Sequence, residues 1–200
     1  MTAIFAFLVG LVASASPSAV AARPSMAIAK TYLELVQAAD AFDVDDAVAA
    51  RDRLFGQHSE SIRRLGAPAR LPALMAIGER VPTRAFDWWR GPAPAPEERT
   101  LVVWWHPDRH DSLRVVLGAQ SLGEFYDMPI VAAIPDGTVR DRKAAGRLIA
   151  ICPDVAFAAV STRILGDVDV GDVPQVSVLQ DNLVVWQGSW EELHQTPLSP

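Results

Sequence analysis

The stretch "TLVVWWHPDRHDSLRVV", residues 100–116, decides the fold class of this 200-residue chain. Its first six residues are rich in β-branched and aromatic side chains, which is typical of a short buried strand. A polar turn follows, and the pattern from Asp111 to Phe125 is helical. The stretch therefore predicts a strand, a turn and an amphipathic helix in direct succession.

The rest of the C-terminal half continues this alternation. Apolar runs predict strands at 129–134 and 155–160, with a helix between them at 141–151. A hairpin of strands 176–179 and 183–186 follows, and a capped helix at 189–194 closes the chain. The order is β-α-β-α-β-β-α, with parallel strands first and an antiparallel pair last. Such an order predicts an α/β fold, a mixed sheet flanked by helices on both faces.

Residues 23–85 carry a different pattern and predict an N-terminal α-helical segment. Asp43, with Asp46 three residues later, is a start signal for the second helix of this segment. A third helical run ends at Gly66, and a short fourth helix is expected at 73–77. The segment predicts a helical layer packed on the main domain.

A Trp/Pro-rich stretch, residues 86–98, separates this segment from the domain at 99–200. Its Pro-Ala-Pro-Ala-Pro core lacks amide donors at the prolines and favours an extended polyproline geometry. We expect residues 86–98 to be a linker and the domain boundary.

Residues 1–22 are predicted to be a signal peptide. An apolar stretch at 3–13 precedes small residues that offer cleavage near residue 15 or 21. No Lys or Arg precedes the apolar stretch, so an uncleaved anchor and a misassigned start codon remain the alternatives. The expected location is exported, periplasmic or secreted.

Charge and cysteine content narrow the classes of partner. The formal net charge is −6 and no run of Lys or Arg occurs, which argues against nucleic acid as a partner. A membrane is expected as a partner only if the N-terminal segment is uncleaved. Cys152 is the single cysteine, so the chain cannot form an internal disulfide.

The ordered set of motifs resembles the thioredoxin fold, in particular the exported TlpA-like thioredoxins. The resemblance runs from Arg99 to the C-terminus. It is carried by the strand and turn quoted above, by "VPQVSVL" at 173–179 and by "NLVVWQGSWEEL" at 182–193, with "WWRG" at 88–91 matching shortly before the first core strand. It implies a thioredoxin-like mixed sheet, with Pro174 as a cis-proline beside the turn.

The sequence departs from that family at the positions of its two cysteines. Counting from Trp105, these positions fall on Arg109 and Ser112. Exchange needs an attacking thiolate and a resolving thiol, which arginine and serine cannot supply. We therefore expect no catalytic residue and no thioredoxin-type disulfide exchange at this turn.

Two other chemistries could use the turn. A divalent metal could bind the imidazoles and carboxylates of His106, Asp108, His110 and Asp111. Ser112 could act as a nucleophile with His106 or His110 as its base. The alternative to both is a polar loop that caps the following helix, and we expect that loop, with no metal and no cofactor.

Binding without chemistry is the function we expect. The resemblance implies a groove that holds an extended client peptide, with Val173 and Pro174 on one wall and Trp105, Arg109 and His110 on the other. A vestigial groove covered by the helical segment remains the alternative. The predicted function is a redox-inactive scaffold, adaptor or chaperone-like protein that binds a protein or peptide. The alternative function is an enzyme: a thiol-disulfide oxidoreductase that pairs Cys152 with a partner thiol, or a metal-dependent hydrolase at the His106/His110 turn.

Overall fold

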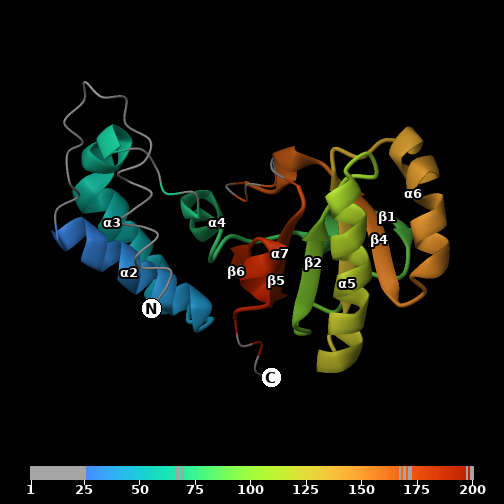
Figure 1. The fold of residues 1–200 in the computed structure, drawn as a ribbon, viewed down its shortest axis with the longest axis horizontal. Coiled ribbons are helices and arrows are strands. Elements are labelled where there is room, and N and C mark those ends of the chain that lie inside the picture. Colours follow the sequence, from blue (N-terminus) through green and yellow to red (C-terminus); the bar gives the residue numbers. More distant parts are fainter. Residues whose placement is uncertain are drawn as a thin grey trace. The chain divides into compact units, whose positions relative to one another are not determined.

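The computed structural model describes residues 26–65, 68, 70–166, 168, 170, 173–196 and 198 (Figure 1). These residues form two compact units, which divide between Met75 and Ala76. The predicted signal peptide, residues 1–22, lies outside the described residues. Among the described helices, none combines the length and apolar composition that crossing a bilayer requires.

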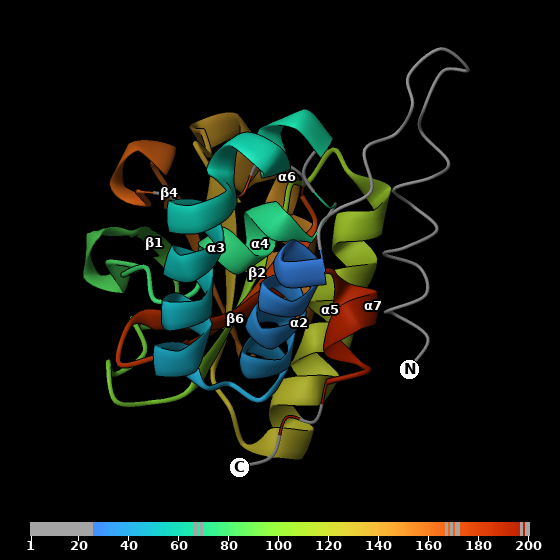
Figure 2. The ribbon, with the colours of Figure 1, turned by 90° about the vertical axis from the view of Figure 1, so that its left-hand side faces the viewer.

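The first unit is helical, as the periodicity predicts. Figure 2 shows α2 and α3 lying side by side, and the unit consists of α2 (Met26–Asp40), α3 (Val44–Leu65) and α4 (Leu71–Met75). Asp43 caps α3, because its side chain accepts a hydrogen bond of 3.1 Å from the backbone N–H of Asp46. The predicted third helix is wrong. Nothing interrupts the helical pattern before Gly66, so that run is the C-terminal part of α3.

The second unit is a mixed sheet of six strands in the order β1-β4-β3-β2-β5-β6. Its strands are β1 (Asp87–Arg90), β2 (Thr100–Trp104), β3 (Ile130–Pro135), β4 (Val155–Val160), β5 (Gln175–Gln180) and β6 (Leu183–Gly188). Strands β2, β3 and β4 are parallel, whereas β1, β5 and β6 each pair in the antiparallel sense. The predicted fold class, a mixed sheet flanked by helices and preceded by a helical segment, is confirmed.

The helices of this unit are α5 (His110–Tyr126), α6 (Val139–Ile151) and α7 (Trp190–Leu193). Capping boxes start both α6 and α7: Thr138 pairs with Asp141, and Ser189 pairs with Glu192. The hairpin turns at Asp181 and Asn182, whose positive φ angles of 53° and 59° suit a tight two-residue turn.

Strand β1 corrects the sequence prediction, which placed residues 86–98 in a linker. Residues 87–90 instead pair with β4 at the edge of the sheet. Arg90 anchors the end of β1, since its guanidinium donates to the carbonyl groups of Ile149 and Pro153. The sequence prediction missed β1 because a strand of four residues at the edge of a sheet, only partly buried, does not produce an apolar run in the sequence. Residues 76–98 therefore belong to the second unit.

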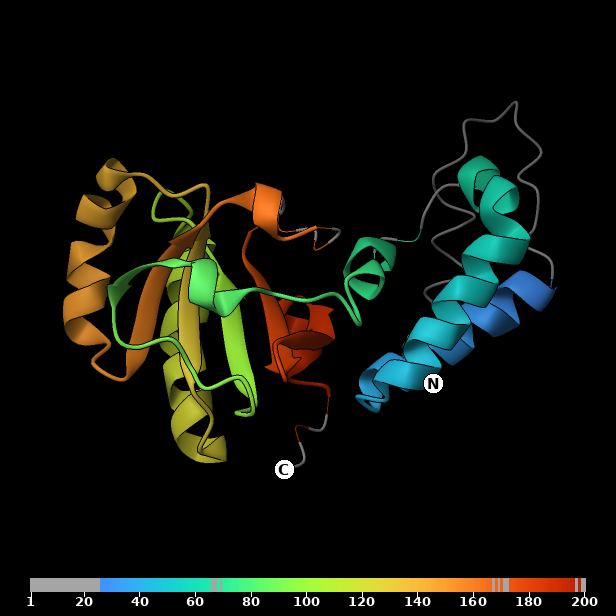
Figure 3. The same ribbon diagram turned by 180° about the vertical axis from the view of Figure 1, so that it is seen from behind.

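Different parts of the chain cover the two faces of the sheet. In Figure 1, α5 lies in front of β2, whereas Figure 3 shows the chain after α4 crossing the opposite face. Buried apolar side chains of that crossing segment, Ala76, Val81 and Phe86, pack against the sheet. Trp104 lies among them and contacts Phe86 at a ring separation of 6.3 Å. Burial of these large side chains is the main stabilising contribution to the unit.

Candidate functional site

The parallel strands end at one edge of the sheet, and their loops meet there. The turn after β2 leads into α5, and β3 and β4 end at the same edge because they run parallel to β2. Strand β5 runs the other way, so its first residue, Gln175, stands opposite Trp104 at the end of β2. The edge at the carboxyl ends of parallel strands is the usual place for ligand sites in α/β folds.

Local hydrogen bonds hold the turn between β2 and α5. The backbone N–H of Arg109 donates to the carbonyl of His106 at 3.1 Å, which closes the turn. Ser112, in the first turn of α5, is buried, and its hydroxyl accepts from the backbone N–H of His106 at 3.3 Å. Ser112 therefore holds the start of the turn. It does not cap α5, whose N-cap residue is Arg109 and which has no side-chain cap, so the expected cap on this helix is wrong. The structure does not bring the Ser112 hydroxyl to a histidine ring, as a nucleophile would require.

Arg109 joins the turn to the loop that precedes β5. Its guanidinium Nη2 donates a hydrogen bond of 3.0 Å to the carbonyl oxygen of Val173. The Val173–Pro174 peptide bond is cis. Arg109 and His110 are exposed, whereas Val173 and Pro174 are half-buried. These four sequence-predicted residues therefore lie at one accessible edge of the sheet.

Trp105 does not belong to that surface, and its predicted place in the groove wall is wrong. Its side chain is fully buried and meets the ring of Phe157 edge-on, with the ring centroids 6.0 Å apart. Successive side chains of a strand point to opposite faces, and both faces of this sheet are covered, so Trp104 and Trp105 are both buried.

The candidate metal ligands of the turn do not converge. His106 lies between two carboxylates, with Nε2 3.7 Å from an oxygen of Asp141 and Nδ1 4.0 Å from one of Asp108. The predicted partners His110 and Asp111 do not join it. In the part of the chain that the structure describes, no group of three or more His, Cys, Asp or Glu side chains could hold a metal ion.

Asp141 is the residue at this edge that the sequence reasoning missed. The side-chain hydrogen bond from Thr138 is the main reason that the pKa of Asp141 is lowered, and the charges of His106 and Arg140 add to the effect. The spacing Thr138-x-x-Asp141 is a capping signature that could have located this carboxylate. Its proximity to His106 depends on the packing of α6 beside the turn and has no local signal.

Cys152 lies far from the turn. It is the C-cap of α6, next to the start of β4, and therefore lies at the opposite end of the parallel strands from Arg109. The thiol is fully buried, and burial raises its pKa, although the nearby charge of Arg90 acts in the other direction. Burial and a raised pKa both oppose formation of a reactive thiolate.

Comparison with solved structures finds chains of similar fold. A chain described as a thio-disulfide isomerase from Thermus thermophilus superposes with a TM-score of 0.44 and 14% identity, over 62% of this chain and 98% of that one. No family model and no curated protein sequence matches this chain.

Proposed function

We propose that this protein is a redox-inactive member of the thioredoxin-like class that binds an extended peptide or protein segment. The binding surface is formed by Arg109, His110, Val173 and Pro174, which we name the 109/173 surface. The protein acts as a scaffold, adaptor or chaperone-like factor and is exported.

One observation carries the proposal: the hydrogen bond between Arg109 and Val173. It brings an exposed cation and a backbone carbonyl together at the edge where the loops meet. Backbone acceptors and exposed arginines are the groups that bind extended peptides, because the first pair with peptide N–H groups and the second with carboxylates. The 109/173 surface carries both, and the Val173 carbonyl has a second lone pair besides the one that Arg109 uses.

The distribution of thiols supports a role without exchange chemistry. The turn carries Arg109 and Ser112 where exchange would need cysteines, and the single thiol of Cys152 is buried. No observation favours the alternative in which Cys152 reacts with a partner thiol, since a partner cannot reach a buried sulfur in the native fold.

The test combines peptide binding with a redox assay. The purified protein is applied to an array of random 9-residue peptides, and the binders are measured in solution by fluorescence polarisation. A photoreactive amino acid replaces His110 in one variant and Lys143, an exposed residue of α6, in a matched control. We expect peptides to crosslink at position 110 and not at 143.

The Cys152→Ser variant separates the two functions. We expect it to bind the same peptides as the wild type, and we expect neither protein to reduce insulin disulfides with dithiothreitol above the uncatalysed rate. Catalysed reduction that disappears in Cys152→Ser would overturn the proposal in favour of thiol chemistry. Absence of any peptide binding would also overturn it.

A further inference from the structure

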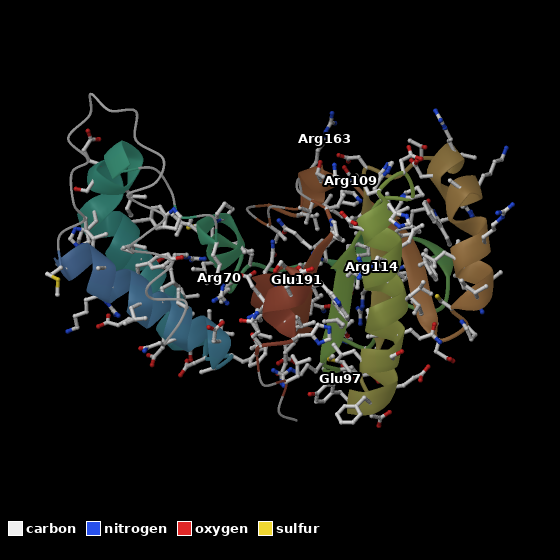
Figure 4. All side chains as sticks on the ribbon, viewed as in Figure 1. Arg70, Glu97, Arg109, Arg114, Arg163 and Glu191 are labelled. Atoms are coloured by element: carbon white, nitrogen blue, oxygen red, sulfur yellow. The ribbon has the colours of Figure 1, made fainter. Side chains whose placement is uncertain are left out.

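The guanidinium of Arg109 is only partly used in the structure. A guanidinium carries five N–H donors. Among the described residues, the one bond of this side chain is the donation from Nη2 to the carbonyl of Val173, and no carboxylate pairs with it. Arg109 is exposed, so its remaining donors are open to a ligand. In Figure 4, Arg109 lies at the N-terminal end of α5 and Arg114 lies further along the same helix.

The carboxylates of the neighbouring loops already have partners. Both oxygens of Asp136 accept from Thr162, at 2.9 Å from its backbone N–H and 2.7 Å from its hydroxyl. Asp141 accepts from the backbone N–H and the hydroxyl of Thr138, at 2.8 and 2.6 Å. Asp136 and Asp141 are therefore already hydrogen-bonded to Thr162 and Thr138. Asp108 and Asp111, which flank Arg109 and His110 in the chain, are exposed and form no ion pair with Arg109, so its positive charge has no acidic partner among the described residues.

The bond to Val173 also makes Arg109 a competitor for the acceptor that a bound peptide would use. A peptide N–H can pair with the Val173 carbonyl only if Arg109 gives up or shares that oxygen. A neutral peptide would replace a charge-assisted hydrogen bond by a weaker neutral one. A peptide that brings a carboxylate gives Arg109 a stronger, two-pronged partner and frees the carbonyl for its own N–H.

We infer that Arg109 is the specificity-determining residue of the 109/173 surface and that it selects peptides with a carboxylate next to the backbone group paired with Val173. The carboxylate is an Asp or Glu side chain or the C-terminal carboxylate of the client. This inference rests on the proposed function, since it specifies the chemistry of the ligand at the same surface.

The test uses the array binders in three chemical forms. Each labelled peptide is measured as found, with its Asp and Glu residues replaced by Asn and Gln, and with its C-terminus amidated. We expect one of the two neutralised forms to bind at least about tenfold more weakly than the original. The form that loses affinity identifies the source of the carboxylate.

Variants then assign the effect to Arg109. Arg109→Gln should weaken binding of the original peptide about tenfold and abolish its preference over the neutralised form. Arg114→Gln removes the same charge from an exposed position on the same helix and should leave both affinities within about twofold of the wild type. Arg109→Lys keeps the charge but loses the planar fork, so its affinity for the carboxylate form should fall between those of the wild type and Arg109→Gln.

The outcomes separate this inference from the proposed function. Equal binding of all three peptide forms to the wild type overturns the inference and leaves peptide binding intact. Equal losses of affinity in Arg114→Gln and Arg109→Gln also overturn the inference and leave peptide binding intact. If no peptide binds, the proposed function fails first. If Arg109→Gln does not fold, the binding of the three peptide forms to the wild type still tests whether the surface selects a carboxylate.

Discussion

Arg109 donates a hydrogen bond from its guanidinium to the carbonyl of Val173, a residue 64 positions later in the chain. The bond connects the turn after β2 with the loop before β5, and neither loop contains a cysteine. The guanidinium is exposed, so water can replace the carbonyl as its partner.

We therefore expect Arg109→Ala to change the free energy of unfolding by less than about 1 kcal/mol, because exposed polar contacts contribute little to stability. Urea denaturation followed by circular dichroism measures the change. A loss of more than about 2 kcal/mol would indicate that the contact maintains the fold, and the 109/173 surface would lose its main support as a binding surface.

Cys152 should be unreactive in the native protein. Its sulfur is buried, so 5,5′-dithiobis(2-nitrobenzoic acid) should react with it slowly at pH 8 and rapidly in 8 M urea, as thiolate exposure dictates. Fast stoichiometric reaction without urea would contradict the burial of the sulfur and favour the alternative in which Cys152 reacts with a partner thiol.

The same thiol makes stability depend on pH. Burial raises the pKa of Cys152, so the folded protein keeps a proton that the unfolded chain loses above its ordinary pKa of about 8.5. The contribution of Cys152 to stability is thus complete below that pH and declines as pH rises through the folded pKa. The Cys152→Ala variant lacks this contribution. The difference between the two free energies of unfolding should shrink from pH 8 to pH 10, and a constant difference would contradict the raised pKa.

Ser177 should matter for stability because it satisfies a buried donor. Its hydroxyl accepts from Trp104 Nε1 at 2.8 Å and donates to Gln187 at 3.1 Å, and all three side chains are fully buried. Ser177→Ala should therefore cost about 1–3 kcal/mol. Ser121→Ala, at an exposed position of α5, is the matched control and should stay within about 0.5 kcal/mol of the wild type. Equal effects of the two changes would argue against the buried network.

Two helical glycines should respond to alanine in opposite directions. A Cβ at Gly123 in α5 would lie 2.5 Å from Ile130 Cγ1 and 2.8 Å from the carbonyl oxygen of Met128. We expect Gly123→Ala to destabilise by about 1–3 kcal/mol. A Cβ at Gly146 in α6 meets nothing within 4 Å, so Gly146→Ala should stabilise by about 0.5–1 kcal/mol through helix propensity. Thermal unfolding compares the two, and a shift of the same sign in both would contradict the packing at Gly123.

Local signals in the sequence were enough to predict most helices and strands of the second unit. The apolar run at 155–160 predicts β4 with the bounds that the structure has. The Ser189 capping signature likewise predicts α7, and the hairpin follows from two short apolar runs around a turn. These elements depend on side-chain periodicity and on caps within a few residues of each other, which a sequence displays directly.

Strand β1 and the burial of Trp105 were decided by the tertiary structure. The backbone of residues 87–90 becomes a strand only because β4, which lies more than sixty residues later, offers an edge. Trp105 is buried because its ring packs against Phe157 on a face of the sheet that other parts of the chain cover. Strand pairing and side-chain burial of this kind depend on parts of the chain that are distant in sequence.

The sequence alone determined that the turn after β2 lacks cysteines and carries Arg109, and its motifs determined the mixed α/β sheet. Only the tertiary structure decided that Arg109 reaches Val173, that Asp141 approaches His106 and that Cys152 is buried at the other end of the strands. The physical reason is that residue identity fixes which groups are available, whereas long-range packing fixes which of them meet and which of them water can reach.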